Sequence, residues 1–212
     1  ILEWATIIEF DSDGDPIEGM SRARDINPNV LTVINVPVSK NVEKKILYLA
    51  QNGAETVHLS ADIHGSGKDG TTLLETLHKS HLLLVDEGLR DRITLVASGG
   101  IAAAEHVPKT IIMGADIVKI DVPLLIAMDT VKWNQSKNGD QIPCPNEIEE
   151  LDPRWGASRV INLMLSWKDQ LLEILGAMGL RDVRRLRGET GRAIFADKAY
   201  TNFLQRLKIL PE

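Results

Sequence analysis

The chain has 212 residues, enough to bury the core of one domain or of one domain with a helical extension. It carries 24 basic and 30 acidic residues, a formal charge of -6 without a basic stripe, which excludes a nucleic-acid footprint and argues against membrane-surface attraction. The single cysteine excludes a disulfide framework, and no apolar run approaches the ~20 residues of a membrane span, so we expect a cytoplasmic protein without a membrane span.

Strand and helix patterns alternate along the first part of the chain. Residues 4–10, WATIIEF, are a strand candidate followed by a turn-rich loop, DSDGDP. Residues 30–36 are a β-branched apolar run, and residues 39–53 follow with helical spacing. The same alternation predicts strands over residues 55–61, 92–98 and 116–122, followed by helices over residues 71–87, 102–113 and 124–127. These βα units predict a parallel sheet with covering helices.

The strands are apolar almost throughout, which indicates burial on both faces of the sheet. Either a doubly wound sheet or part of a (β/α)₈ barrel has this pattern. A complete barrel takes roughly 250 residues and eight units, so the sequence favours about half a barrel. The remaining strands are then expected from a preceding segment or from another chain, because a barrel sheet must close on itself.

The second part of the chain has a different texture. We expect a partial barrel over residues 1–130, a polar loop over 131–155, and a helical extension over 156–212 that packs on the barrel. Within the extension, residues 155–179 have the apolar spacing of a long amphipathic helix. The segment 180–192 carries five arginines, which indicate either a solvated helix face with salt bridges or a contact with an anion or partner.

Several motifs occur in an order that resembles a known family. NGAETVHLSADIHGSGKDG, LVASGGI, MGADIVKIDVPLLIAM, CPNEIEELDP and VINLMLSWKDQLLEILGAMGLRDVRRLRGETG follow one another between about Val33 and Ile194. This order is similar to the C-terminal half of the FMN-binding barrel of the glutamate synthase large-subunit family. The resemblance implies an α/β fold, the C-terminal part of a TIM-type (β/α)₈ barrel followed by a helical extension. It also implies FMN beside a [3Fe-4S] cluster and reductive transfer of ammonia to 2-oxoglutarate.

The resemblance places two glycine motifs against the flavin. Gly99 and Gly100, preceded by Ser98, match the turn that presents backbone amides to the FMN phosphate, a contact that glycine permits because it lacks a Cβ. Gly65, Ser66 and Gly67 match the family's Gly-Thr-Gly loop over the substrate side of the flavin. A tight turn is the alternative interpretation of the Gly-Gly pair.

Two departures predict a weakened FMN site. Asn35 stands where the family has a lysine near the flavin ring, and an asparagine cannot neutralise charge on the reduced ring. At the next strand end, Lys119 and Asp121 fall in the family's Gly-x-Gly-Thr motif. A carboxylate ~4 Å from the phosphate is repelled by roughly 4 kcal/mol per pair of unit charges at an effective dielectric of about 20. Lys119, or a carboxylate that turns away, would offset this repulsion.

The cluster cysteines are largely absent from the sequence. The family holds its cluster with three cysteines, of which only the last is matched, by Cys144, while Thr130 stands at the first position. We therefore expect no iron-sulfur cluster held by this chain alone, and no other metal site. His78 and His81 have helical metal-ligand spacing but no third ligand in view, so an ordinary helix face is the favoured interpretation.

The candidate catalytic residues are Asp62, His64 and Lys68, in the loop after the second βα strand. A histidine beside a carboxylate can act as acid or base near neutral pH. The family has histidine at the position of Asp62 and glycine at that of His64, so an ordinary loop pair is the alternative. His58, inside the strand, is expected to be polar filling of the core or of the barrel interior.

Three functions follow from these observations. The first is an FMN-dependent oxidoreductase of glutamate synthase type, with a small-molecule substrate and an electron-donor subunit. The second is a catalytically decayed barrel that serves as a structural subunit or module of a larger redox complex. The third, a barrel that binds another phosphate or nucleotide ligand, fits SGGI but explains little else.

Overall fold

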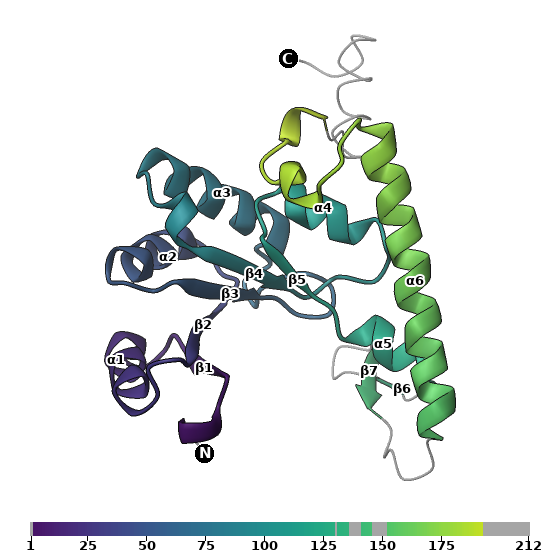
Figure 1. Cartoon of the computed structure of the whole chain (residues 1–212), viewed down its shortest axis with the longest axis horizontal. Helices are drawn as coiled ribbons and strands as arrows, with labels where there is room; N and C mark the ends of the chain where they lie inside the picture. The colour runs from purple at the N-terminus through teal and green to yellow at the C-terminus, as the bar shows by residue number, and fades with distance from the viewer. Residues whose placement is uncertain (1, 130, 136–140, 146–151, 193–212) are drawn as a thin grey trace.

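The computed structural model describes residues 2–129, 131–135, 141–145 and 152–192. Its centre is a parallel sheet of β1 (Ile7–Asp11), β2 (Leu31–Pro37), β3 (Thr56–Ser60), β4 (Thr94–Ser98) and β5 (Ile117–Lys119), arranged in that order (Figure 1). A doubly wound sheet reverses its strand order near the middle, whereas a (β/α)₈ barrel keeps the chain order. The five described strands therefore form an open part of a barrel-type sheet, with β1 and β5 at its edges.

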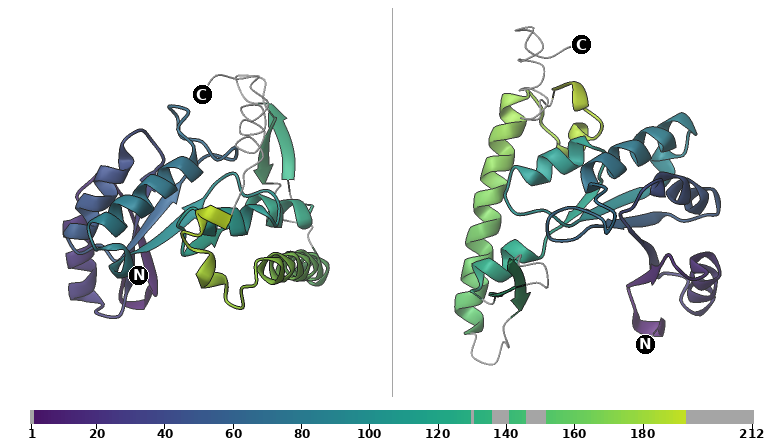
Figure 2. Two further views of the ribbon diagram at one scale, coloured as in Figure 1. Left: turned by 90° about the horizontal axis from the view of Figure 1, so that it is seen from above. Right: turned by 180° about the vertical axis from the view of Figure 1, so that it is seen from behind.

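Helices that connect successive strands cover one face of the sheet (Figures 1 and 2). They are α1 (Pro16–Ile26), α2 (Val42–Gln51), α3 (Leu73–Asp86) and α4 (His106–Ile112). Helix α5 (Val122–Ala127) follows the edge strand β5. Sequence patterning missed α1, although its start signal is present in the turn-rich loop. Asp15 caps the helix by accepting a 3.0 Å hydrogen bond from the amide of Glu18, and Pro16 occupies the first turn.

Two element boundaries differ from the sequence prediction for local reasons. The helix predicted from residue 102 begins at His106, close before Pro108, because proline is tolerated only in the first turn of a helix. The strand predicted to reach residue 122 ends at Lys119, because Asp121 caps α5 and Val122 and Pro123 begin that helix. Both corrections place more loop at the carboxyl ends of β4 and β5.

The segment after α5 is more structured than the predicted polar loop. An antiparallel pair, β6 (Val131–Gln135) and β7 (Gln141–Pro145), lies within residues 131–155, and α6 (Pro153–Ala177) begins before that range ends. Beyond α6, the basic segment forms short 3₁₀ turns over Val183–Leu186 and Thr190–Arg192 instead of a helix. Residues 193–212 of the predicted extension lie outside the described residues, as does Thr130.

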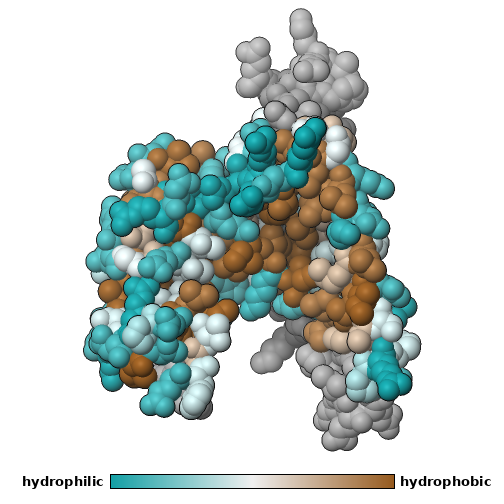
Figure 3. Space-filling model, in the orientation of Figure 1, coloured by the Kyte–Doolittle hydropathy of each residue, from teal (hydrophilic) through white to brown (hydrophobic). Residues whose placement is uncertain are grey.

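Burial divides the sheet into two unequal faces. The face under the helices is sealed by side chains that are at most 1% exposed: Ile34, Val36, Val57, Leu59, Leu95 and Ala97. The alternate residues form the opposite, concave face, where Ile7, Leu31 and Ile117 are 60%, 57% and 51% exposed. The expectation of burial on both faces is therefore wrong for the described residues, and in Figure 3 apolar residues gather in the hollow where β5, α5 and α6 meet.

The long helix α6 runs beside the β5 end of the sheet and contacts α5 (Figure 2). Leu175 and Leu186 form a small second core with Ile111 and Ile112 of α4. Through Leu175, α6 thus packs against α4. No helix in the described part of the chain combines the length and apolar character needed to cross a membrane.

Candidate functional site

The loops at the carboxyl ends of β2, β3 and β4 pack backbone against backbone through glycines. A Cβ on Gly67 would lie 2.0 Å from the carbonyl oxygen of Val38, and one on Gly100 would lie 2.7 Å from the Cα of Gly65. A Cβ on Gly99 would lie 2.5 Å from a carbonyl oxygen of the β3–α3 loop, and both Gly99 and Gly100 have positive φ, +99° and +68°. Loop packing alone is therefore sufficient reason for the Gly-Gly pair.

The same turn leaves backbone donors unused. Among the described residues, no acceptor is recorded for the amides of Gly99, Gly100 and Ile101, whereas the next amide, of Ala102, donates to His106 Nδ1 at 3.1 Å. Successive free amides in a turn with positive φ form a concavity that suits an anion. The turn thus meets the geometric requirement of a phosphate site as well as that of tight packing.

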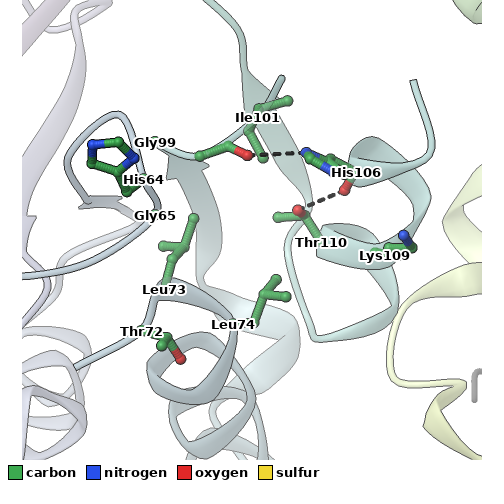
Figure 4. A pocket seen from close by; sticks show the side chains of 11 residues that line it. His64, Gly65, Thr72, Leu73, Leu74, Gly99, Ile101, His106, Lys109 and Thr110 are labelled. Atoms are coloured by element: carbon green, nitrogen blue, oxygen red, sulfur yellow. Dashed lines mark hydrogen bonds between the residues drawn. The ribbon is translucent and has the colours of Figure 1, made fainter. Parts of the chain in front are cut away.

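A cavity of about 370 Å³ lies between the β3–α3 loop and α4, beside this turn (Figure 4). Leu73 and Leu74 reach into it from the first turn of α3 and face His106 and Thr110 of α4. His64 and Lys109 also border it, and its described lining contains no carboxylate. The cavity therefore combines an apolar floor with basic groups at its rim.

A second cavity, of about 520 Å³, lies on the other side of the β3–α3 loop. Asp62, Ser66, Gly67 and Lys68 line it from that loop. Ser12 lines it from the end of β1, and its hydroxyl is buried without a hydrogen-bond partner in the described structure. The predicted loop residues are thus divided between two cavities.

The candidate acid–base residues are not arranged as a pair. Asp62 Oδ1 accepts hydrogen bonds from the backbone amides of His64 at 2.9 Å and of Ser66 at 2.8 Å. The carboxylate therefore shapes its own loop, and the His64 ring belongs to the first cavity while Asp62 and Lys68 line the second. This geometry favours the loop-pair interpretation of Asp62 and His64.

The predicted flavin-site residues at the ends of β2 and β5 differ in their hydrogen-bond partners. Asn35 donates to Asp11 Oδ1 at 3.3 Å, and its own Oδ1 is buried without a partner among the described residues. Asp121 Oδ1 accepts from the amide of Val122 at 2.6 Å, so this carboxylate is held at the start of α5. Lys119, at the end of β5, lies in register with Ser98.

A polar network that sequence reasoning did not assemble crosses the concave face. The His58 ring, in a residue only 5% exposed, hydrogen-bonds through Nδ1 to Glu9 Oε1 and through Nε2 to Ser98 Oγ at 2.7 Å. The burial of His58 agrees with its expected place in the core or the barrel interior. The sequence did contain a signal for this contact. Side chains alternate between the two faces of a strand, and this alternation places His58 of β3 and Ser98 of β4 on the same face of neighbouring strands.

The basic segment contacts the body of the molecule. Arg187 donates to Asp116 Oδ1 at 2.6 Å and to Asp91 Oδ1 at 3.2 Å, and buried Arg90 donates to the other oxygen of Asp116 at 2.8 Å. The segment is therefore not a helix face, but it forms the salt bridges that were expected, and those of Arg187 join it to Asp116 and Asp91.

His81 belongs to this ionic cluster. It accepts a 3.0 Å hydrogen bond from Arg90 Nε. Burial, and then the positive charges of Arg90 and Arg187, lower the pKa of His81 to about 4. No group of three metal-ligating side chains occurs among the described residues, so His78 and His81 have no third ligand there.

Comparison with protein families identifies one matching family. A model of the conserved region in glutamate synthase matches residues 7–181. The archaeal glutamate synthase [NADPH] of Methanocaldococcus jannaschii is 36% identical over 114 residues, which cover 51% of this chain and 22% of the relative. The ferredoxin-dependent glutamate synthase of Cyanidium caldarium is 22% identical over 174 residues, 77% of this chain and 11% of the relative. The chain thus spans only a small part of these relatives.

Solved structures share the fold. A flavocytochrome b2 with benzoylformate has a TM-score of 0.59 at 17% identity, covering 88% of this chain and 43% of that one. A mandelate oxidase with a monooxide FMN adduct has a TM-score of 0.53 at 15% identity, covering 81% and 44%. These similarities confirm an α/β fold corresponding to part of a TIM-type (β/α)₈ barrel.

Proposed function

Since the chain belongs to the glutamate synthase family, we propose that it forms the FMN-binding part of an oxidoreductase that converts a 2-oxo acid, 2-oxoglutarate, to its amino acid. The observation that carries the proposal is that the amides of Gly99, Gly100 and Ile101, at the carboxyl end of a barrel strand, have no acceptor within the described part of the chain. Active sites of such barrels lie at this end.

The residues around the turn fit a flavin phosphate. The three amides would hold the phosphate oxygens, with Ser98 at the start of the turn and Lys119 beside it in register. Asp121 opposes an anion less than its charge alone suggests, because an amide already occupies one of its oxygens. When bound, FMN supplies the site with a carrier of a hydride.

Other residues would act on the ring and the substrate. The unpartnered oxygen of Asn35 offers an acceptor to a ring N–H, and the loop of Gly65, Ser66 and Gly67 would cover the substrate side. Lys68 is a candidate partner for a substrate carboxylate. Asp62 would hold this loop through its two amide bonds, and His64 would contribute from the first cavity.

The concave face supports a proposal about partners. Its exposed Ile7, Leu31 and Ile117 need cover, and a closed barrel has eight strands where five are described here. We propose that a preceding segment or another chain supplies the other strands, and that an electron-donor subunit reduces the flavin. The single cysteine cannot hold a cluster that needs three thiolates, so electrons would arrive without a cluster of this chain.

Titration of the purified, flavin-free protein with FMN tests the proposal. We expect flavin fluorescence to be quenched with saturation near one FMN per chain. Gly99→Ala should weaken binding, whereas Gly53→Ala, at another positive-φ glycine with nothing within 4 Å of its Cβ position, should not. A protein that binds no FMN would contradict the proposal.

The alternative, a decayed barrel acting as a structural subunit of a redox complex, is favoured by the carboxylate of Asp121 and by Asn35. Asp121→Asn keeps the helix cap and removes the charge. If the site has decayed, the double variant Asp121→Asn/Asn35→Lys should bind FMN where the wild type does not. Wild-type binding with turnover would reject this alternative.

A further inference from the structure

Three strands contribute one side chain each to the connected polar network on the concave face. Glu9 lies in β1, His58 in β3 and Ser98 at the last position of β4. His58 and Ser98 are 5% and 8% exposed, whereas the side chain of Glu9 is 42% exposed toward the open side of the sheet. The network is therefore buried at His58 and Ser98 and reaches the surface at Glu9.

The contacts of the His58 ring are compatible with one particular neutral tautomer. An ionised carboxylate can only accept a hydrogen bond, so in this tautomer Nδ1 of His58 donates to Glu9. In the neutral ring, Nε2 must then accept, and its partner at 2.7 Å is the hydroxyl of Ser98. A hydroxyl, an imidazole and a carboxylate in this sequence of donors form the arrangement that activates a serine as a nucleophile.

The backbone after Ser98 supplies the other requirement for acyl transfer. In α/β-hydrolases, backbone amides stabilise the oxyanion, and one of them belongs to the residue after the nucleophile. Here the amides of Gly99, Gly100 and Ile101 follow Ser98, and none has an acceptor among the described residues. The nucleophile and the oxyanion donors thus lie at the end of β4, and the base and the orienting carboxylate reach the nucleophile from β3 and β1.

We propose that Ser98 is an activated nucleophile that hydrolyses esters of short acyl groups. Ser98 Oγ attacks the ester carbonyl, its proton passes to His58 Nε2, and the amides after Ser98 receive the oxyanion. The alcohol then leaves with the proton from His58. In the second half of the reaction, His58 Nε2 takes a proton from a water, the water attacks the acyl-serine carbonyl, and Ser98 Oγ regains the proton as the acid is released. No oxidant or metal is required.

The neighbouring side chains define the substrate class. Val33 and Val96 lie on the same face and pair in register with Glu9 and His58. A short apolar acyl group would contact these valines, while a charged one would meet the carboxylate of Glu9. The activity is independent of flavin chemistry, although a phosphate bound to the same amides would compete with it.

Labelling with a fluorophosphonate probe tests the proposal on the intact, flavin-free protein. Peptide mass spectrometry should find the label on Ser98, and the protein should hydrolyse p-nitrophenyl acetate. Ser98→Ala should abolish labelling, and His58→Gln should slow it by roughly 10²-fold or more, the usual contribution of a general base. Ser60→Ala is the matched control, because Ser60 pairs with Ser98 in register and should leave labelling unchanged.

Each result decides the proposal. Absence of label from the folded wild-type protein, label on another residue, or equal labelling of the His58→Gln variant would overturn it. Site mapping on the wild type keeps the test valid even where a variant fails to fold. FMN binding is measured separately, so failure of the flavin site leaves this result unaffected.

Discussion

The two faces of the sheet differ in which side chains they bury and in what those side chains can do. Under the helices, Leu59 and Leu95 are fully buried, and the inward positions of β2 to β4 are apolar except for Thr32. On the concave face, exposed apolar residues such as Leu31 occupy the amino ends of the strands, and polar residues such as Asn35 and Ser98 occupy the carboxyl ends. The helix-covered face therefore contributes most of the buried apolar core. The concave face has exposed apolar side chains at the amino ends of its strands and the polar residues of the candidate site at their carboxyl ends.

The largest expected effect tests this contrast with a pair of leucines. Leu59→Ala, on the helix side, should lower the free energy of unfolding by about 2–5 kcal/mol, because it leaves a cavity in a packed core. Leu31→Ala, at a position 57% exposed, should change it by less than about 0.5 kcal/mol in this chain. Urea unfolding measures both, and equal losses would show that the concave face is not open. In a protein with a completed barrel, the Leu31→Ala loss should grow.

The next largest effect is expected in the loops at the carboxyl ends of β3 and β4, where Gly100 packs against Gly65. Gly100→Ala should lower the free energy of unfolding by about 1–3 kcal/mol, from positive φ and from contact with the backbone of Gly65. Gly70→Ala is the control, since Gly70 has φ of +80° but nothing within 4 Å of its Cβ position. Thermal unfolding should show the larger loss for Gly100→Ala. Similar losses would mean that the loops separate to accept a side chain.

A smaller effect concerns the C-terminal segment on the helix side. Arg187→Ala should cost about 1–2 kcal/mol, because it removes charged hydrogen bonds to Asp116 and Asp91 from a partly exposed site. Arg184→Ala, which removes a surface ion pair with Asp182, should have no measurable effect. Hydrogen exchange should report faster opening after Leu186 in the first variant. Indistinguishable variants would show that the segment is not anchored by Arg187.

The effect that is smallest at neutral pH, and that grows only as the solution is acidified, is a pH dependence on the helix side. His81 has a folded-state pKa of about 4, below the ordinary value of 6.5, so the unfolded state binds a proton that the folded state does not. Stability should therefore fall as the pH falls from 6.5 toward 4. His81→Gln should flatten this dependence of the urea midpoint, whereas His64→Gln should not. An unchanged slope in His81→Gln would place the dependence elsewhere.

The repeating βα pattern could be predicted because each strand and helix carries its own local signal. Sequence alone could not distinguish a barrel from a doubly wound sheet, since strand order is a property of pairing between distant segments. It also missed α1, whose cap residues resemble a turn, and it assigned a strand to residues that begin α5. Local rules describe which residues form an element, but the contacts between elements fix its ends.

The sequence predicted which residues belong to the candidate site, but it did not predict how they are arranged. Alignment of motifs found Gly99 and Gly100 but could not show that their Cβ positions are filled by another loop. Asp62 and His64 are near in sequence, yet the carboxylate binds amides and the ring turns to another cavity. The network of Glu9, His58 and Ser98 joins residues 49 and 40 positions apart, which no local pattern connects.

The order of the strands also bears on how the chain acquires its structure. Each strand pairs with the one made before it, so pairing can proceed step by step during synthesis without waiting for distant segments. The tie from Arg187 to Asp91 spans 96 positions and can form only after α6 has emerged. Interactions that form late change the rate of unfolding more than the rate of folding. Loss of the Arg187 contacts of the C-terminal segment should therefore raise the unfolding rate of the assembled sheet more than it lowers the folding rate.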